Sequence, residues 1–143
     1  MTKPFKPLAC LVGVALWAAA ASAQTISIEP GEWEYNLEGQ FGPVAISDDG
    51  TDCVSPDEAT ADLADLIEGL GNDCRLTAFE RAGGRLTASV VCTGNLPLHA
   101  DAEVTMSDGA AEADMTGTLF TDTPAEAPLA MRATARRIGQ CSG

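Results

Sequence analysis

After residue 24 the chain alternates for long stretches between apolar and polar residues, the pattern of strands that bury one face. The alternating stretches are residues 25–29, 32–38, 44–46, 74–81, 85–92, 98–107, 111–120 and 129–138. Asp108–Gly109 is a strong signal for a two-residue hairpin loop, and we expect further turns at Pro30–Gly31 and Asp48–Gly50. Strands joined by such short turns predict an antiparallel sheet.

One segment has helical rather than strand periodicity. Ser55 suits the N-cap, Pro56 the first helical position and Glu58 the last position of a capping box. The apolar residues then recur at helical spacing: Ala59, Leu63, Leu66, Ile67 and Leu70. The sequence therefore predicts one α-helix of about four turns, over about residues 56–70.

These elements predict a mostly β (α+β) domain. We expect a single antiparallel meander sheet, curved or barrel-like, with the helix packed on it. Neither a linker nor an internal repeat divides residues 24–143, so the prediction is one domain. Many inward positions hold alanine or glycine, which leaves a thin core and gives covalent cross-links more weight.

Residues 1–23 have the pattern of a secretory signal peptide. Lys3 and Lys6 precede an apolar run of about 14 residues, and Ala21–Ala23 supplies the small residues of a cleavage site. We expect cleavage between Ala23 and Gln24, and a periplasmic or secreted protein without a membrane span. Lipidation at Cys10 is the alternative, but this cysteine lies near the start of the apolar run rather than after it.

Charge narrows the classes of partner. The full chain of 143 residues has a net charge of −13, and both lysines lie in the predicted signal peptide. Its removal leaves 6 arginines against 21 acids, a net charge of −15. Such a surface excludes binding to nucleic acid or to anionic lipid through a basic patch.

The cleaved chain retains four cysteines: Cys53, Cys74, Cys92 and Cys141. An even number in an exported domain favours disulfides, and four cysteines allow three pairings. A three-residue hairpin loop at Ala82–Gly84 would place Cys74 opposite Cys92, which leaves Cys53 to pair with Cys141. A zinc site is not expected, because there is no CxxC pair and a single histidine.

The register of this hairpin has one alternative. The three-residue loop sets Arg81 opposite Arg85, which is mildly unfavourable. A two-residue loop at Gly83–Gly84 avoids that contact but moves Cys74 opposite Thr93. We predict the first register because it brings the two cysteines together.

His99 is the candidate for acid–base or metal chemistry. It lies in a polar row with Asp101 and Glu103. A two-residue loop at Asp108–Gly109 would place Glu103 opposite Asp114, with Asp101 and Glu112 nearby on the same face. These carboxylates on one patch could hold Ca²⁺. The competing interpretation, which we favour, is that Arg132 and Arg136 of the adjoining strand neutralise part of the patch.

Other chemistry has little support. The cleaved chain has no lysine, no second histidine and no GxSxG, so the familiar hydrolytic triads lack parts. Trp33 and Tyr35 could line a small apolar pocket, although large aromatic residues of this kind more often belong to a core. We predict no cofactor.

Several motifs in order resemble a known family. They are Pro30–Glu34, Cys53–Ala59, the hairpin Arg81–Leu86 between Cys74 and Cys92, and Arg136–Cys141. Over Glu29–Cys141 the chain resembles the bacterial domain-of-unknown-function 3617 family, exported proteins of Gram-negative bacteria. The family commonly has a proline where this chain has Gln140, and the loop 121–128 is individual. The resemblance implies a periplasmic or secreted location but no activity, so no site residue is transferred.

The leading hypothesis is a monomeric, non-enzymatic binding module for a small apolar ligand or an envelope protein. The alternative is a Ca²⁺-dependent module or an enzyme that uses the acidic sheet face with His99.

Overall fold

The computed structural model describes residues 24–142. The predicted signal peptide and its cleavage site, together with Cys10, lie outside the described residues. Within them the chain forms nine strands and one helix. In chain order these are β1 (Thr25–Ser27), β2 (Gly31–Phe41), β3 (Val44–Val54), β4 (Thr60–Asp62), α1 (Leu63–Gly69), β5 (Cys74–Ala82), β6 (Arg85–Cys92), β7 (Leu98–Ser107), β8 (Ala110–Leu119) and β9 (Ala127–Gly139).

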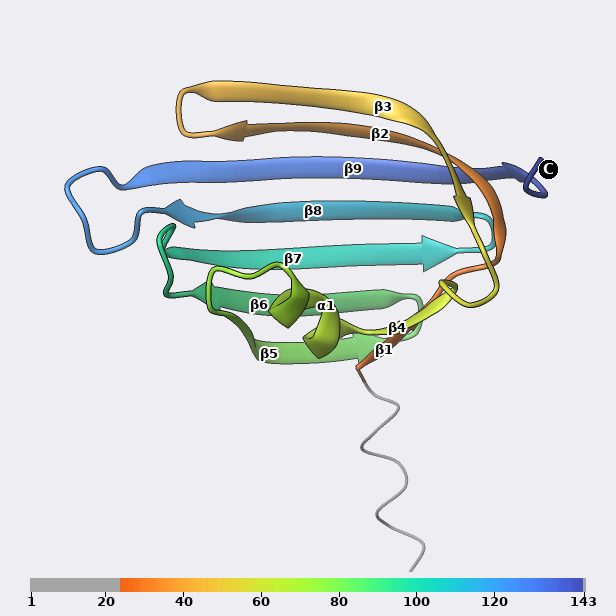
Figure 1. Ribbon diagram of the computed structural model, residues 1–143, viewed down its shortest axis with the longest axis horizontal. Helices are drawn as coiled ribbons and strands as arrows, with labels where there is room; N and C mark the ends of the chain where they lie inside the picture. The colour runs from red at the N-terminus through yellow and green to blue at the C-terminus, as the bar shows by residue number, and fades with distance from the viewer. Residues whose placement is uncertain (1–23, 143) are drawn as a thin grey trace, which may run out of the picture.

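Seven strands form one antiparallel sheet in the order β3-β2-β9-β8-β7-β6-β5, while β1 and β4 pair in a second, two-stranded sheet. Strands β5 to β9 are a meander, and β2 pairs with β9, so the β2–β3 hairpin extends the sheet beyond the last strand (Figure 1). The prediction of a mostly β, antiparallel domain with one helix is confirmed. Within residues 24–142 the large sheet is open rather than barrel-like, with β3 and β5 as its edges.

The register sorts the side chains onto two faces. We call one the apolar face; it carries alternate residues of β6 to β9 and β2, such as Val90, Ala100, Met115, Leu129 and Leu37. The intervening residues form the polar face. Helix α1 lies in front of the β5–β7 half of the sheet in Figure 1 and packs on the apolar face.

Two clusters make up the core of the apolar face. Beneath α1, Cys74, Val90 and Cys92 are buried and Ile67 of the helix packs against them. On the central strands β7, β8 and β9, near the end of the sheet where β8 leads into β9, Ala100, Leu119 and Leu129 are buried among half-buried neighbours. No polar side chain of the described residues is buried. The core is thin, as the alanine-rich pattern predicts.

The helix is shorter than predicted and begins later. Asp62 is the N-cap, and its carboxylate accepts from the backbone nitrogens of Ala64 and Asp65. Half of the expected capping box forms, because the backbone nitrogen and hydroxyl of Ser55 donate to Oε2 of Glu58 at 3.1 and 2.8 Å. The backbone nitrogen of Glu58 donates to the Ser55 carbonyl instead of its hydroxyl. These contacts close an isolated turn instead of starting a helix. Residues 60–62 then pair with β1 as a strand, which overrides the local capping signal.

The turn predicted at Asp48–Gly50 is wrong. Strand β3 runs straight through these residues, and the chain reverses at Gly42–Pro43, where Gly42 has a φ of +58°. Every residue of β3 pairs with one of β2, so the ladder outweighs the turn propensity. Gly50 fits because the ring of Tyr35 lies against it: a Cβ at position 50 would lie 3.1 Å from the Tyr35 hydroxyl.

The β5–β6 hairpin corrects one prediction and confirms another. Its loop has two residues, Gly83 and Gly84, because Ala82 pairs with Arg85. A bulge between Leu76 and Ala78 then shifts the register by one residue, which brings Cys74 opposite Cys92 after all. The two registers considered above each predicted one feature of the hairpin, and both features are present: Arg81 and Arg85 are not paired, and Cys74 faces Cys92.

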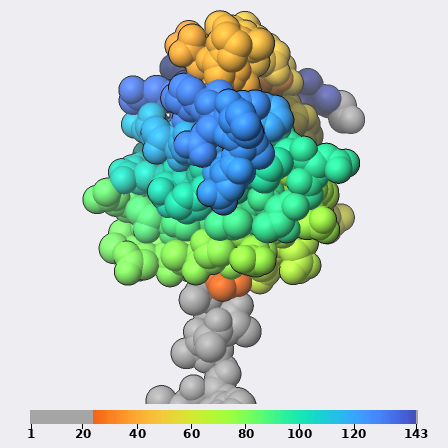
Figure 2. Space-filling view, turned by 90° about the vertical axis from the view of Figure 1, so that its left-hand side faces the viewer, coloured from red at the N-terminus to blue at the C-terminus, as the bar shows by residue number. Residues whose placement is uncertain are grey.

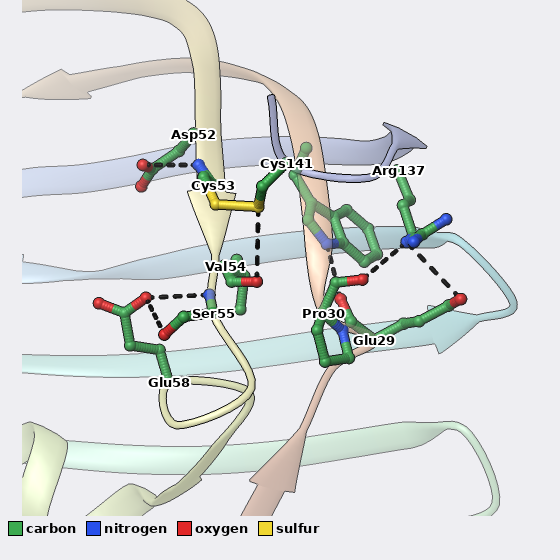
Figure 3. The surroundings of a disulfide bond; sticks show 10 residues. Glu29, Pro30, Asp52, Cys53, Val54, Ser55, Glu58, Arg137 and Cys141 are labelled. Atoms are coloured by element: carbon green, nitrogen blue, oxygen red, sulfur yellow. Dashed lines mark hydrogen bonds and ion pairs between the residues drawn. A yellow bond between two sulfur atoms is a disulfide. The ribbon is translucent and has the colours of Figure 1, made fainter. Parts of the chain in front are cut away.

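Both predicted disulfides are present in the structure. Cys74–Cys92 joins β5 to β6 with its Cα atoms 4.0 Å apart. Cys53–Cys141 joins the end of β3 to the segment after β9, with Cα atoms 5.5 Å apart (Figure 3). The second bridge links the two strands that flank β2, because Glu32 of β2 pairs with both Cys53 and Gly139.

Candidate functional site

The polar face carries the four acidic residues that the Asp108–Gly109 hairpin was expected to bring together. Glu103 of β7 and Asp114 of β8 lie directly opposite each other, as predicted. Asp101 faces Thr116 and Glu112 faces Thr105, so both lie nearby on the same face, as expected. Directly facing carboxylates repel each other unless a cation lies near them.

Arginines supply that compensation. Arg132 lies with Nε 3.8 Å from Oδ1 of Asp114, as the favoured interpretation expects, and Nη2 of Arg85 lies 2.6 Å from Oε2 of Glu103. The sequence did not single out Arg85. Arg136, expected to help here, pairs with Glu34 of β2 at 3.1 Å. All these side chains are exposed, so each pair contributes about 0–1 kcal/mol.

The acidic patch has a poor arrangement for a metal ion. Among residues 24–142, no group of three or more His, Cys, Asp or Glu side chains is placed to hold one. The regular ladder also turns its carbonyl groups into strand pairing, whereas Ca²⁺ sites draw carbonyl ligands from irregular backbone.

His99 lies exposed on the polar face of β7. The residues directly across the ladder are Val91 on β6 and Thr118 on β8. Asp101, two residues along the same row, accepts a hydrogen bond from the Ser89 hydroxyl. The ladder therefore gives His99 no carboxylate or thiol directly opposite it with which to share a proton.

Open depressions lie over this face. One of about 730 Å³ lies over β5 to β8 and includes Ser89, Asp101 and Glu103 in its lining. Another of about 610 Å³ lies over β3, β2 and β9 and includes Glu34, Asp49 and Arg136 in its lining. Charged and hydroxyl residues outnumber apolar residues in both linings, although Phe79 and three alanines give the first a partly apolar surface.

Trp33 and Tyr35, the predicted pocket residues, have different environments. Trp33 is 7% exposed, and its indole nitrogen donates to the carbonyl of Glu29 at 2.9 Å. Tyr35 is half-buried, and its hydroxyl lies 3.4 Å from Oδ2 of Asp48. The negative charge of Asp48, with smaller effects from partial burial and from the hydrogen bond to Asp48, raises the pKa of the Tyr35 hydroxyl. A ligand arriving from solvent would therefore meet Tyr35 rather than Trp33.

A further group of apolar side chains lies beside Tyr35 on the apolar face. We call it the apolar strip; it comprises Leu37 of β2, Ala113 and Met115 of β8, and Met131 and Ala133 of β9. All five are half-buried. They form two adjacent rows, because Leu37 pairs with Ala133, which pairs with Ala113, and Met131 pairs with Met115. In Figure 1 helix α1 lies over β5–β7 and not over this part of the sheet.

The sequence contained a signal for the strip but did not locate it. Alternation assigns these five residues to the buried face of the sheet, but it does not predict which part of that face the helix will cover. That depends on the short α1 and on the pairing of β2 with β9, neither of which the periodicity specifies.

Comparison with known proteins identifies a family but no activity. A family model described as "Protein of unknown function (DUF3617)" matches residues 28–141, which confirms the resemblance seen in the sequence. No curated protein and no solved structure matched the chain. Among the described residues, no helix has the length and apolar character needed to cross a membrane.

Proposed function

Because the chain belongs to the DUF3617 family of proteins of unknown function, we propose its role from the geometry of the sheet: an exported, non-enzymatic domain that binds a small apolar ligand. The apolar strip is the proposed binding surface. The ligand's chemistry follows from that of the strip, which offers methionine, leucine and alanine side chains and no charge.

The half-covered apolar face carries this proposal. A sheet that buries one face normally covers it completely with helices or a second sheet. Here the only helix of residues 24–142 packs against β5 and β4, at one end of the large sheet. Leu37, Met115 and Met131 remain half-buried beyond it. Methionine is a flexible, polarisable side chain that adapts to varied apolar ligands.

The export part of the proposal rests on two features. Residues 1–23 have the pattern of a secretory signal. Two disulfides join the four remaining cysteines, and disulfides persist mainly in oxidising compartments. Cell fractionation tests it: we expect the protein in the periplasm or medium, starting at Gln24, and a cytoplasmic full-length chain would overturn it.

A binding titration tests the function. The mature domain is titrated with 1-anilinonaphthalene-8-sulfonate and then with decanoate as a competitor. We expect saturable fluorescence that decanoate displaces, and a binding constant at least about tenfold weaker in Leu37→Asn and Met131→Gln. Thr134→Asn, on the polar face of β9 next to Ala133, is the matched control and should bind normally. Equal binding by all variants, or none by the wild type, would refute the proposal.

The metal-dependent alternative has its own test. Thermal melting of the same domain is measured with millimolar Ca²⁺ and with a chelator. A shift of several degrees that Asp114→Asn abolishes would favour a Ca²⁺ module over an apolar-ligand domain, whereas the proposed function predicts coincident melting curves.

A further inference from the structure

Strand β3 presents a long open edge. Its eleven residues pair with β2 in one uninterrupted register, without a bulge. Among residues 24–142 no strand pairs with its other side, and in Figures 1 and 2 the β2–β3 hairpin forms one rim of the molecule. Both ends are fixed, by the Gly42–Pro43 turn and by the Cys53–Cys141 disulfide. A straight, anchored edge of this length is a template for another strand.

The register identifies the backbone groups on this edge. A two-residue hairpin loop makes Phe41 and Val44 the closing pair that exchanges both hydrogen bonds. Alternation then directs the N–H and C=O groups of the odd-numbered residues away from β2. The nitrogen of Cys53 agrees with this, since it donates to Oδ1 of Asp52 at 2.9 Å. The outward groups available for pairing therefore belong to Ala45, Ser47, Asp49 and Thr51.

The opposite edge of the sheet is protected in ways that β3 is not. Strand β5 contains the bulge at Thr77, and helix α1 packs against it. Arg81 at its end donates from Nη2 to the carbonyl of Thr25 at 2.6 Å. Bulges and covering elements of this kind block strand addition. Strand β3 has no bulge and no proline, and its only obstacle is charge.

That charge selects the occupant. Asp48 and Asp52 project on the apolar-face side of β3 and Asp49 on the other, and the strand contains no basic residue. The ion pairs of the described residues involve none of these three carboxylates. Two copies paired through β3 would bring three carboxylates from each chain to one seam, which disfavours a second copy. An extended segment with lysine or arginine at alternate positions would instead meet opposite charge along the seam.

We propose that the outer edge of β3 binds an extended, basic peptide segment of another protein as an eighth strand of the sheet. Main-chain hydrogen bonds to residues 45–51 supply the contact, and the three aspartates select for basic side chains. The edge adjoins the apolar strip at one point, since Asp48 pairs with Leu37 of β2. The proposed main-chain contacts lie on the opposite side of β3 from β2 and do not depend on the proposed apolar ligand.

The experiment compares two nine-residue peptides with blocked ends, one alternating lysine with threonine and valine, the other with glutamate in place of lysine. Binding to the mature domain is followed by calorimetry and by amide hydrogen exchange. Thr51→Pro deletes one outward N–H without removing a bond to β2, and Thr51→Val is its control. A triple variant of Asp48, Asp49 and Asp52 to Asn removes the charge, with Asp108→Asn and Asp122→Asn in loops as its control.

We expect the lysine peptide to bind, more weakly as salt rises, and to slow exchange at Ser47, Asp49 and Thr51. Binding should weaken about tenfold in Thr51→Pro and in the triple variant but not in the controls. The glutamate peptide should not bind. Binding without protection of these amides would show charge attraction alone, and it would overturn the proposal. So would the absence of binding, or dimerisation of the domain through β3. Because exchange is measured in the wild type, poor folding of a variant does not leave the proposal undecided.

Discussion

Loss of the Cys53–Cys141 disulfide should destabilise this domain strongly. The bridge spans 88 residues of sequence, so it restricts the unfolded chain far more than the 18-residue span of Cys74–Cys92. On the loop-entropy model the two bridges contribute about 4.6 and about 3.2 kcal/mol. Since small domains unfold with about 5–15 kcal/mol, the first value is a large share of the total.

The variant Cys53→Ser/Cys141→Ser isolates this contribution, because Cys53 is exposed and Cys141 half-buried, and serine leaves little cavity there. Urea unfolding of the mature domain can be followed by the fluorescence of Trp33, which is buried and is the single tryptophan of residues 24–143. We expect the free energy of unfolding to fall by about 4–5 kcal/mol. Gln140→Ser, next to the bridge, should change it by less than about 0.5 kcal/mol. A loss below about 2 kcal/mol with an unchanged m-value would refute the argument from the unfolded chain.

Three further predictions concern single positions. Leu129→Ala should lower the unfolding free energy by about 2–5 kcal/mol, because this side chain is 4% exposed on the central strand β9. Pro128→Ala, at the exposed neighbouring position, should be nearly neutral, and urea unfolding measures both variants. Deleting Thr77 should remove the bulge yet leave Cys74 opposite Cys92, so peptide mapping should still find the Cys74–Cys92 disulfide. Without the bulge the β5 edge is regular, and light scattering should detect new association of the domain through it. A different cysteine pairing in the peptide map would contradict this. The pKa of Glu58 is lowered mainly by the backbone N–H of Ser55 and also by the Ser55 hydroxyl. The ionised carboxylate therefore stabilises the folded state fully above the unfolded pKa of about 4.3, and this stabilisation is lost as pH falls through the lower folded pKa. Glu58→Gln should therefore flatten the acid limb of stability against pH, as measured by urea unfolding at a series of pH values.

The sequence predicted those features that depend on neighbouring residues. Alternation located the strands of the β7–β8 hairpin, and Asp108–Gly109 set its register, so that Glu103 was correctly placed opposite Asp114. Local chemistry also predicted the contact between Ser55 and Glu58, even though the helix expected after it begins at Leu63.

Features decided by pairing with distant residues could not be predicted in this way. The turn signal at Asp48–Gly50 lost to eleven residues of pairing with β2. Cys74 and Cys92 face each other for a reason that could not be predicted. The two-residue loop shifts the register by one residue from the predicted one, and the bulge at Thr77 shifts it back. Of the site, periodicity indicated which residues share a face. It could not show that Trp33 is buried and donates to the Glu29 carbonyl while Leu37 and Met131 stay half-buried. Those differences depend on where the short helix and the segments before β2 and after β3 lie on the sheet.

The pairing of β2 with β9 has a consequence for the order of folding. It joins Glu32 to Gly139 and Phe41 to Leu129, residues about as far apart in the chain as the domain allows. The β2–β3 hairpin is made early in synthesis, but its place in the sheet exists only once the last strand is available. Contacts this remote in sequence form slowly, because the long intervening loop must close first. We therefore expect the seven-stranded sheet to be completed only after β9 is available, an order of folding that is compatible with the export proposed above.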